Sequence, residues 1–153
     1  MPSSSKFEVQ ATPRAQQAPI SLEVACSALE ELWSPRVVGQ VNNQYIKVAR
    51  VQGEFPWHSH EHEDEMFLVL RGVLCVGRDE ADGGAVSLHP GEFFVVPRGV
   101  RHNTSAEEET WLALIETVTT LHTGSEQTPL TRSIAEQLGA ERLGAEQPGQ
   151  LPK

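Results

Sequence analysis

Two histidines and a glutamate fall close together in the middle of the chain, at spacings that suit a metal ion. They are His58, His60 and, five residues further on, Glu65. Because side chains alternate across an extended strand, His58 and His60 would point to the same face. Two imidazoles on one face can bind a divalent transition metal, and Glu65 would join them from the start of the next strand. These residues alone allow two interpretations, a metal site or two surface imidazoles in an acidic, hydrophilic loop.

A second segment offers another imidazole. An apolar run that follows Gly91 leads into Pro97-Arg98-Gly99, and His102 comes three residues later. Proline fixes φ and glycine permits the reversal, so the three residues predict a tight turn between two strands, with His102 near the start of the second. The spacing alone does not place His102 beside the first segment.

The elements that must position these residues are short strands. Between residues 36 and 116, short apolar or β-branched runs alternate with Gly, Pro, Asn and Asp, which favours a sandwich or barrel over a sheet with intervening helices. Asp82-Gly83-Gly84 reads as a hairpin turn. The expected strands are Val37–Gln40, Tyr45–Val51, Trp57–His60, Met66–Leu70, Val73–Val76, Ala85–Leu88, Phe93–Val96, His102–Thr104 and Trp111–Glu116.

The segments on either side have a different composition. Residues 1–19 are rich in Ser, Gln, Ala and Pro and are expected to form a flexible leader. Apolar residues at helical spacing predict a short helix over 21–33, with Ser27 and Glu30 as a capping box. The polar C-terminal tail, 121–153, is expected to be partly helical near Ser133 and Glu136, a second capping box. One domain, 20–120, with its barrel at 36–116, is the resulting prediction.

The two histidine-containing segments resemble the two signature motifs of the cupin superfamily. The first motif corresponds to His58-x-His60, four residues, Glu65, six residues and Gly72, and the second to Gly91, five residues, Pro97-x-Gly99, two residues and His102. The resemblance covers residues 37 to 116. It departs from the family pattern in two places: four residues instead of five separate Gly53 from His58, and Ala106 stands where the second motif usually has Asn.

This resemblance implies an all-β fold, the double-stranded β-helix of the cupin or jelly-roll barrel. It also implies one divalent transition metal held inside the barrel by His58, His60, Glu65 and His102. Four ligands around an octahedral ion leave two open positions, which catalysis or ligand binding requires. The ligand types suit Fe, Mn, Ni, Zn or Cu alike, so the sequence does not select the ion.

Other residues with chemical potential receive simpler interpretations. His62 is expected to be solvated, and His89 and His122 to lie at the surface. Tyr45 and Lys47 share a strand face and are candidates for binding a substrate carboxylate or for acid and base catalysis. Cys26 and Cys75 lack the spacing of a metal or redox pair, so both are expected to be reduced.

The formal net charge of −9 disfavours a nucleic-acid partner, because phosphate backbones would be repelled. No signal-peptide or membrane-length apolar run is found, so we expect a cytoplasmic protein without a membrane partner. We expect a homodimer with a small-molecule ligand in the barrel.

Two classes of function remain open. The first is a metalloenzyme acting on a small organic molecule, either a dioxygenase or a redox-neutral isomerase, lyase or cyclase. The alternative is a non-catalytic module that binds a sugar or a carboxylate. A phosphosugar isomerase ranks last, because no basic cluster for phosphate is evident.

Overall fold

The computed structural model describes residues 18–124 and 126–139, and within them strands predominate. Most of the leader and residues 140–153 of the tail lie outside the described residues. No described helix is long and apolar enough to cross a membrane. In chain order the elements are α1 (Leu22–Ser27), β1 (Arg36–Val41), β2 (Gln44–Glu54), β3 (Glu65–Arg71), β4 (Leu74–Arg78), the 3₁₀ helix η1 (Glu80–Asp82), β5 (Val86–Leu88), β6 (Phe93–Val96), β7 (His102–Thr117) and α2 (Ile134–Gln137).

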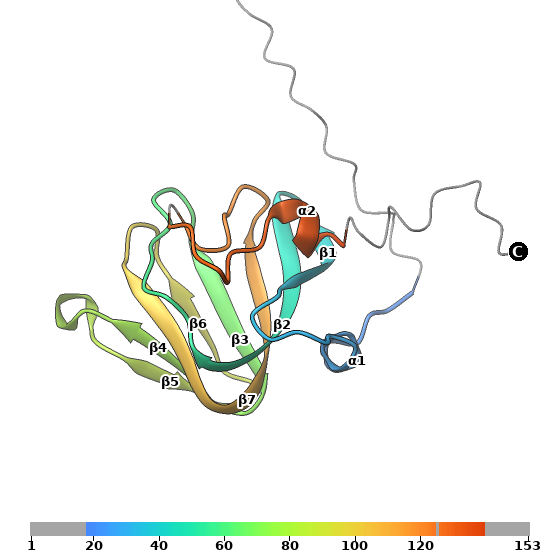
Figure 1. Ribbon diagram of the computed structural model, residues 1–153, viewed down its shortest axis with the longest axis horizontal. Helices are drawn as coiled ribbons and strands as arrows, with labels where there is room; N and C mark the ends of the chain where they lie inside the picture. The colour runs from blue at the N-terminus through green and yellow to red at the C-terminus, as the bar shows by residue number, and fades with distance from the viewer. Residues whose placement is uncertain (1–17, 125, 140–153) are drawn as a thin grey trace, which may run out of the picture.

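The strands form one strongly curved antiparallel sheet, whose main path runs β1-β2-β7-β3-β6 (Figure 1). β7 is the central strand. Its first residues pair with β4, which carries β5 on its other side, and its second half pairs with β2 and β3. Because one long strand contacts both parts of the sheet, His102 at its start and Glu116 near its end are held in one framework.

Alternation along the strands separates the interior from the outside. In β3, Glu65, Phe67 and Val69 are buried, whereas Met66 and Leu68 are only half-buried. The sequence predicted this division, since residues two apart share a face. The barrel interior is filled from several strands by Ala49, Val51, Phe55, Phe67, Val69, Leu74, Val76, Leu88, Val96, Ala106, Leu112 and Leu114.

The N-terminal helix is shorter than expected. α1 begins after Ser21, whose side chain accepts a hydrogen bond from the Val24 amide, and ends before Ala28. The prediction of a helix over 21–33 capped by Ser27 was therefore wrong. Beyond Leu29 the chain pairs with β2 instead: the Trp33 amide donates to the Arg50 carbonyl oxygen at 2.9 Å, and the Arg50 guanidinium donates to the Leu29 carbonyl oxygen at 2.5 Å. Leu29 and Trp33 are buried, but Leu32 is exposed.

Two strand predictions need correction as well. Residues 57–60 form no strand; a single bridge joins His58 to His102. The expected strands at 102–104 and 111–116 are parts of one strand, β7, because the exposed run Glu107–Glu109 continues the extended backbone. The predicted hairpin does connect β4 to β5, and η1 forms its turn, followed by Gly83 and Gly84 at positive φ.

The segment that follows β7 packs against the barrel. Figure 1 shows it, in orange to red, crossing over one end of the strands and reaching α2 beside β1. The capping box of Ser133 and Glu136 is present. Thr120, Thr123 and Gln137 are fully buried, so this part of the predicted polar tail belongs to the folded domain.

Candidate metal centre

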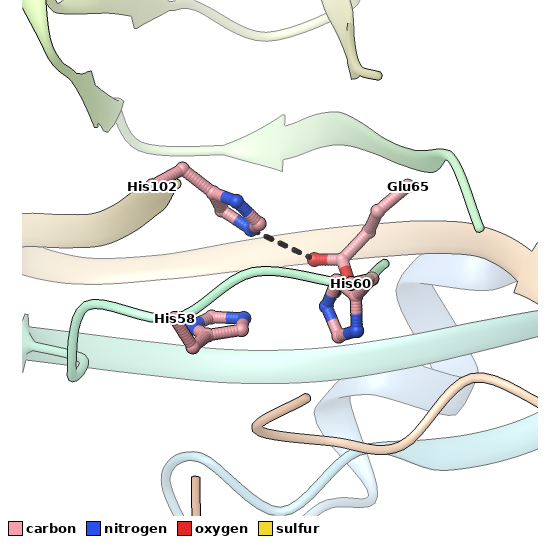
Figure 2. A group of neighbouring side chains, drawn as sticks. All are labelled: His58, His60, Glu65 and His102. Atoms are coloured by element: carbon pink, nitrogen blue, oxygen red, sulfur yellow. Dashed lines mark ion pairs between the residues drawn. The ribbon is translucent and has the colours of Figure 1, made fainter. Parts of the chain in front are cut away.

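The structure brings His58, His60, Glu65 and His102 together from three segments of the chain (Figure 2). His58 and His60 lie in the connection between β2 and β3, Glu65 begins β3 and His102 begins β7. The backbones of His58 and His102 exchange two hydrogen bonds of 2.9 Å, which fixes the second segment beside the first. The Gly99 amide also donates to the His60 carbonyl oxygen at 2.7 Å.

One ligand atom from each of the four residues lies within 4.8 Å of the others, and all four residues are buried. Opposite ligands of a metal ion at about 2.2 Å would lie about 4.4 Å apart. The four atoms are therefore about as far apart as the ligands of one ion.

Two imidazole rings are oriented by the backbone. Nδ1 of His58 lies 2.8 Å from the Pro56 carbonyl oxygen, and Nδ1 of His102 lies 3.0 Å from the Val100 carbonyl oxygen. Since a carbonyl oxygen only accepts, both Nδ1 atoms must carry the proton and donate. The lone pairs of both Nε2 atoms then point into the site, the arrangement that metal-binding histidines require.

The inward-facing nitrogens lack partners. Nε2 of His58, His60 and His102 is buried without a hydrogen bond to any described residue. Oε2 of Glu65 lies within ion-pair distance of Nε2 of His60, at 2.8 Å, and Oε1 lies 3.9 Å from Nε2 of His102. Buried polar atoms are normally satisfied. A cation coordinated by these atoms satisfies them together, so the residues present fit a metal ion.

Burial and the Glu65 carboxylate set the protonation of the site. Burial lowers the pKa of His58 to about 4, against the opposing effect of Glu65. Burial lowers the pKa of His60, but the adjoining Glu65 carboxylate outweighs it, so the pKa is raised. For Glu65, burial would raise the pKa, but His102 and His60 hold it well below its usual range. The site thus offers an ionised carboxylate and imidazole nitrogens, a donor set that suits divalent transition metals.

A cavity opens beside this cluster. It is narrow: the space open to the centre of a water molecule measures about 30 Å³. His58 and Glu65 form part of its wall, which is otherwise mainly apolar and aromatic, with three further polar side chains. The apolar wall includes Trp33, Val51, Phe55, Phe67, Leu112 and Leu114, and the further polar residues are Thr104, Glu116 and His122.

Glu116 is a cavity residue that the sequence analysis did not identify. It lies directly opposite Glu65 across β3 and β7, and its Oε1 accepts from Lys47 Nζ at 2.6 Å. Burial and the neighbouring Glu65 raise the pKa of Glu116 to about 8, against the opposing charge of Lys47. The acidic residue at the end of an apolar strand was visible in the sequence, but the strand register that pairs it with Glu65 was not.

His122 is the second cavity residue that was missed, and the prediction that it lies at the surface was wrong. Its ring packs against Phe55, with centroids 5.0 Å apart. Burial lowers the pKa of His122 to about 4. Because it lies in the segment expected to be a tail, nothing in the sequence linked it to the barrel. His62, in contrast, is 79 % exposed at its side chain, as expected.

Tyr45 and Lys47 are both buried, and neither lines the cavity. Lys47 Nζ donates to Glu116 Oε1 and, at 2.5 Å, to Gln137 Oε1. Their proposed role in catalysis stays a prediction. Of the other aromatic residues in the barrel strands, Phe67 reaches the cavity wall.

Comparisons with known proteins agree with this fold. The cupin domain (Cupin_2) family model matches residues 46–118. A cupin-2 domain containing protein from Shewanella frigidimarina NCIMB 400 is 36 % identical, with a TM-score of 0.60 over 64 % of this chain and 93 % of that one. Protein NMB1881 from Neisseria meningitidis is 29 % identical, with a TM-score of 0.58 over 65 % and 99 % of the two chains.

Among curated sequences, the uncharacterized protein YdbB of Bacillus subtilis is 33 % identical over 67 residues, which is 44 % of this chain and 58 % of that protein. The chain belongs to the cupin superfamily, and its fold is the predicted double-stranded β-helix. The motif resemblance inferred from the sequence is thereby confirmed.

Proposed function

We propose that this cupin binds one divalent transition metal ion through His58, His60, Glu65 and His102, and that it is a metalloenzyme acting on a small organic molecule. The observation that carries the proposal is the set of three buried, unpartnered Nε2 atoms that converge with one carboxylate at the wall of a cavity. Such a metal supplies Lewis-acid or redox chemistry to an oxygen-bearing substrate.

The protein's own residues have three roles in this proposal. Hydrogen bonds from Nδ1 of His58 and His102 to backbone carbonyls keep the metal-facing nitrogens unprotonated. The apolar wall excludes water, which strengthens electrostatic interactions within the cavity. Glu116, opposite Glu65, is a buried group that can hold a proton beside the substrate. These features fit a dioxygenase or a redox-neutral isomerase, lyase or cyclase.

Metal content and turnover test the proposal in two stages. Protein purified without chelators is expected to contain close to one equivalent of Fe, Mn, Ni, Zn or Cu, and Glu65→Gln is expected to lose most of it. Protein reconstituted with each ion is then assayed for dioxygen uptake and for isomerisation or elimination across small aromatic, diol and carboxylate substrates. If the fully metal-loaded protein binds these molecules but turns over none of them with any of the ions, the non-catalytic binding module is favoured instead.

The same proposal includes a cytoplasmic homodimer. Exposed Phe93 and Val95 lie on β6, which ends the main strand path of the sheet. An edge strand with apolar side chains favours pairing with another chain, and a second copy would cover it.

A further inference from the structure

We propose that His122 is a ligand-binding residue of the metal cavity, and that its Nε2–H donates a hydrogen bond to the anionic group of a small, largely apolar monoanion. This inference rests on the proposed metal centre and names the class of molecule that the cavity accepts.

The first step is the tautomer of His122. The Arg132 backbone amide donates to His122 Nδ1 at 2.9 Å. Since a backbone amide only donates, Nδ1 must be the acceptor, and in the neutral ring the proton lies on Nε2. His122 lines the cavity, and among the described residues its hydrogen bond is made at Nδ1, which leaves Nε2–H for a bound molecule.

The metal-facing histidines have the opposite arrangement. His58 and His102 donate from Nδ1 to carbonyl oxygens and present Nε2 lone pairs, which suit a cation. His122 presents an N–H, which suits an oxygen that carries negative charge. The same cavity wall therefore combines lone pairs for a metal with a fixed donor for an anion.

The charge of the site favours an anionic ligand. Three neutral imidazoles and the Glu65 carboxylate carry one negative charge, so a divalent ion leaves one positive charge. Lys47 and Glu116 cancel when Glu116 is ionised and add one positive charge when it is protonated, so the loaded cavity is positive in both states. A singly charged anion neutralises the cavity in the first state and offsets half of the excess charge in the second, and excess charge is costly where water is excluded.

The walls define the rest of the ligand. Phe55 stacks on Trp33 with centroids 4.9 Å apart, and its ring lies 5.0 Å from that of His122 and 5.5 Å from that of His58, so an aromatic surface adjoins the metal ligands. Such a surface favours a flat, apolar body and offers few partners to the hydroxyl groups of a sugar. An aromatic or short aliphatic carboxylate combines these properties.

Benzoate is the probe for the test, and benzamide is its neutral counterpart of the same shape. Both are titrated into the zinc-loaded full-length protein by calorimetry, after zinc content has been measured. Benzoate is expected to bind at least tenfold more tightly than benzamide. Equal affinities, or no benzoate binding to fully zinc-loaded protein, would overturn the inference while leaving the metal centre intact; failure to retain zinc would instead refute the proposed function.

Two variants separate the donor from the structural contact. His122→Asn keeps an acceptor near the Nδ1 position for the Arg132 amide but lacks the Nε2 donor, whereas His122→Gln keeps an N–H near the Nε2 position. Benzoate affinity is expected to fall at least tenfold in His122→Asn and to stay within about threefold of wild type in His122→Gln. His89→Asn, at an exposed site, is the control and should bind as wild type.

The reverse order of affinities in the two His122 variants, or an equal loss in both, would assign His122 a structural role and refute the proposal. If His122→Asn fails to fold by circular dichroism, His122→Gln and the comparison of benzoate with benzamide still decide the question.

Discussion

Replacing Lys47 with methionine, which keeps much of the side chain's length without its charge, is expected to destabilise the metal-free protein by about 2–3 kcal/mol at pH 9. Lys47 is fully buried, and its Nζ donates to Glu116 Oε1 at 2.6 Å and to Gln137 Oε1 at 2.5 Å. At pH 9 Glu116 is ionised, because its pKa is about 8. The variant lacks the cation that allows this carboxyl to ionise in the interior, so its Glu116 stays protonated to higher pH and the stabilising ion pair is lost.

The destabilisation caused by Lys47→Met should be larger at pH 9 than at pH 6. At pH 6 Glu116 holds a proton in wild type and variant, so the deficit is reduced to lost hydrogen bonds, about 1–2 kcal/mol. Above pH 8 only the wild-type carboxyl ionises readily, because the missing cation raises the pKa further in the variant. The destabilisation must therefore grow as the pH rises through 8.

Urea unfolding of metal-free protein at pH 6 and pH 9 measures both values. Lys47→Met/Glu116→Leu should recover most of the loss at pH 9, because no unpaired charge remains. Arg98→Met, which removes an exposed ion pair with Asp64 at 3.7 Å, is the control and should cost less than about 1 kcal/mol. A Lys47→Met deficit no larger than that of the control, or one independent of pH, would refute the reasoning.

Four further outcomes follow from the structure. Gly72→Ala should lower the free energy of unfolding in urea by about 2–4 kcal/mol, because Gly72 has a φ of 85° and a Cβ there would clash with Thr110 Oγ1. Gly91→Ala, with a φ of 84° but open space around it, is the control, and an equal loss in both variants would contradict the clash with Thr110. Burial lowers the pKa of His122 to about 4, so between pH 6.5 and 4 the unfolded chain binds more protons than the folded protein, and stability falls as the pH falls. The difference in unfolding free energy between wild type and His122→Asn should therefore shift against wild type by about 2 kcal/mol from pH 7 to 4.5, and a constant difference would argue against this reasoning. Zinc at 100 times its Kd should stabilise wild type by about 2.7 kcal/mol but not Glu65→Gln, as measured by thermal unfolding; an equal shift in both would place the metal elsewhere. Light scattering should give a dimer mass for wild type and a monomer mass for Phe93→Glu, and a wild-type monomer would contradict the dimer.

Much of the candidate site was predictable because it lies in two short motifs. The two motifs, from His58 to Gly72 and from Gly91 to His102, correspond to turns and to the first residues of strands, and the structure groups the same four residues. The reason given for His58 and His60 was incomplete, however. They point together although residues 57–60 form no strand, because the bridge between His58 and His102 holds that connection in place.

What could not be predicted depends on contacts between distant parts of the chain. Glu116 reaches the cavity because the strand register sets it opposite Glu65. His122 reaches it from a segment whose polar composition resembled a tail. α1 ends early because the backbones of Leu29 and Trp33 form hydrogen bonds with Arg50 of β2, contacts that helical periodicity cannot reveal. In each case the deciding partner lies at least 15 residues away, beyond the reach of local pattern.

A calorimetric zinc titration of metal-free wild-type protein and of His102→Ala tests the central claim most directly, because His102 is the ligand contributed by the distant segment. The four-residue site predicts one zinc ion per chain in the wild type and a loss of affinity of at least a hundredfold in the variant. Absent binding in the wild type, or equal affinity in the two proteins, would contradict a metal centre at these residues.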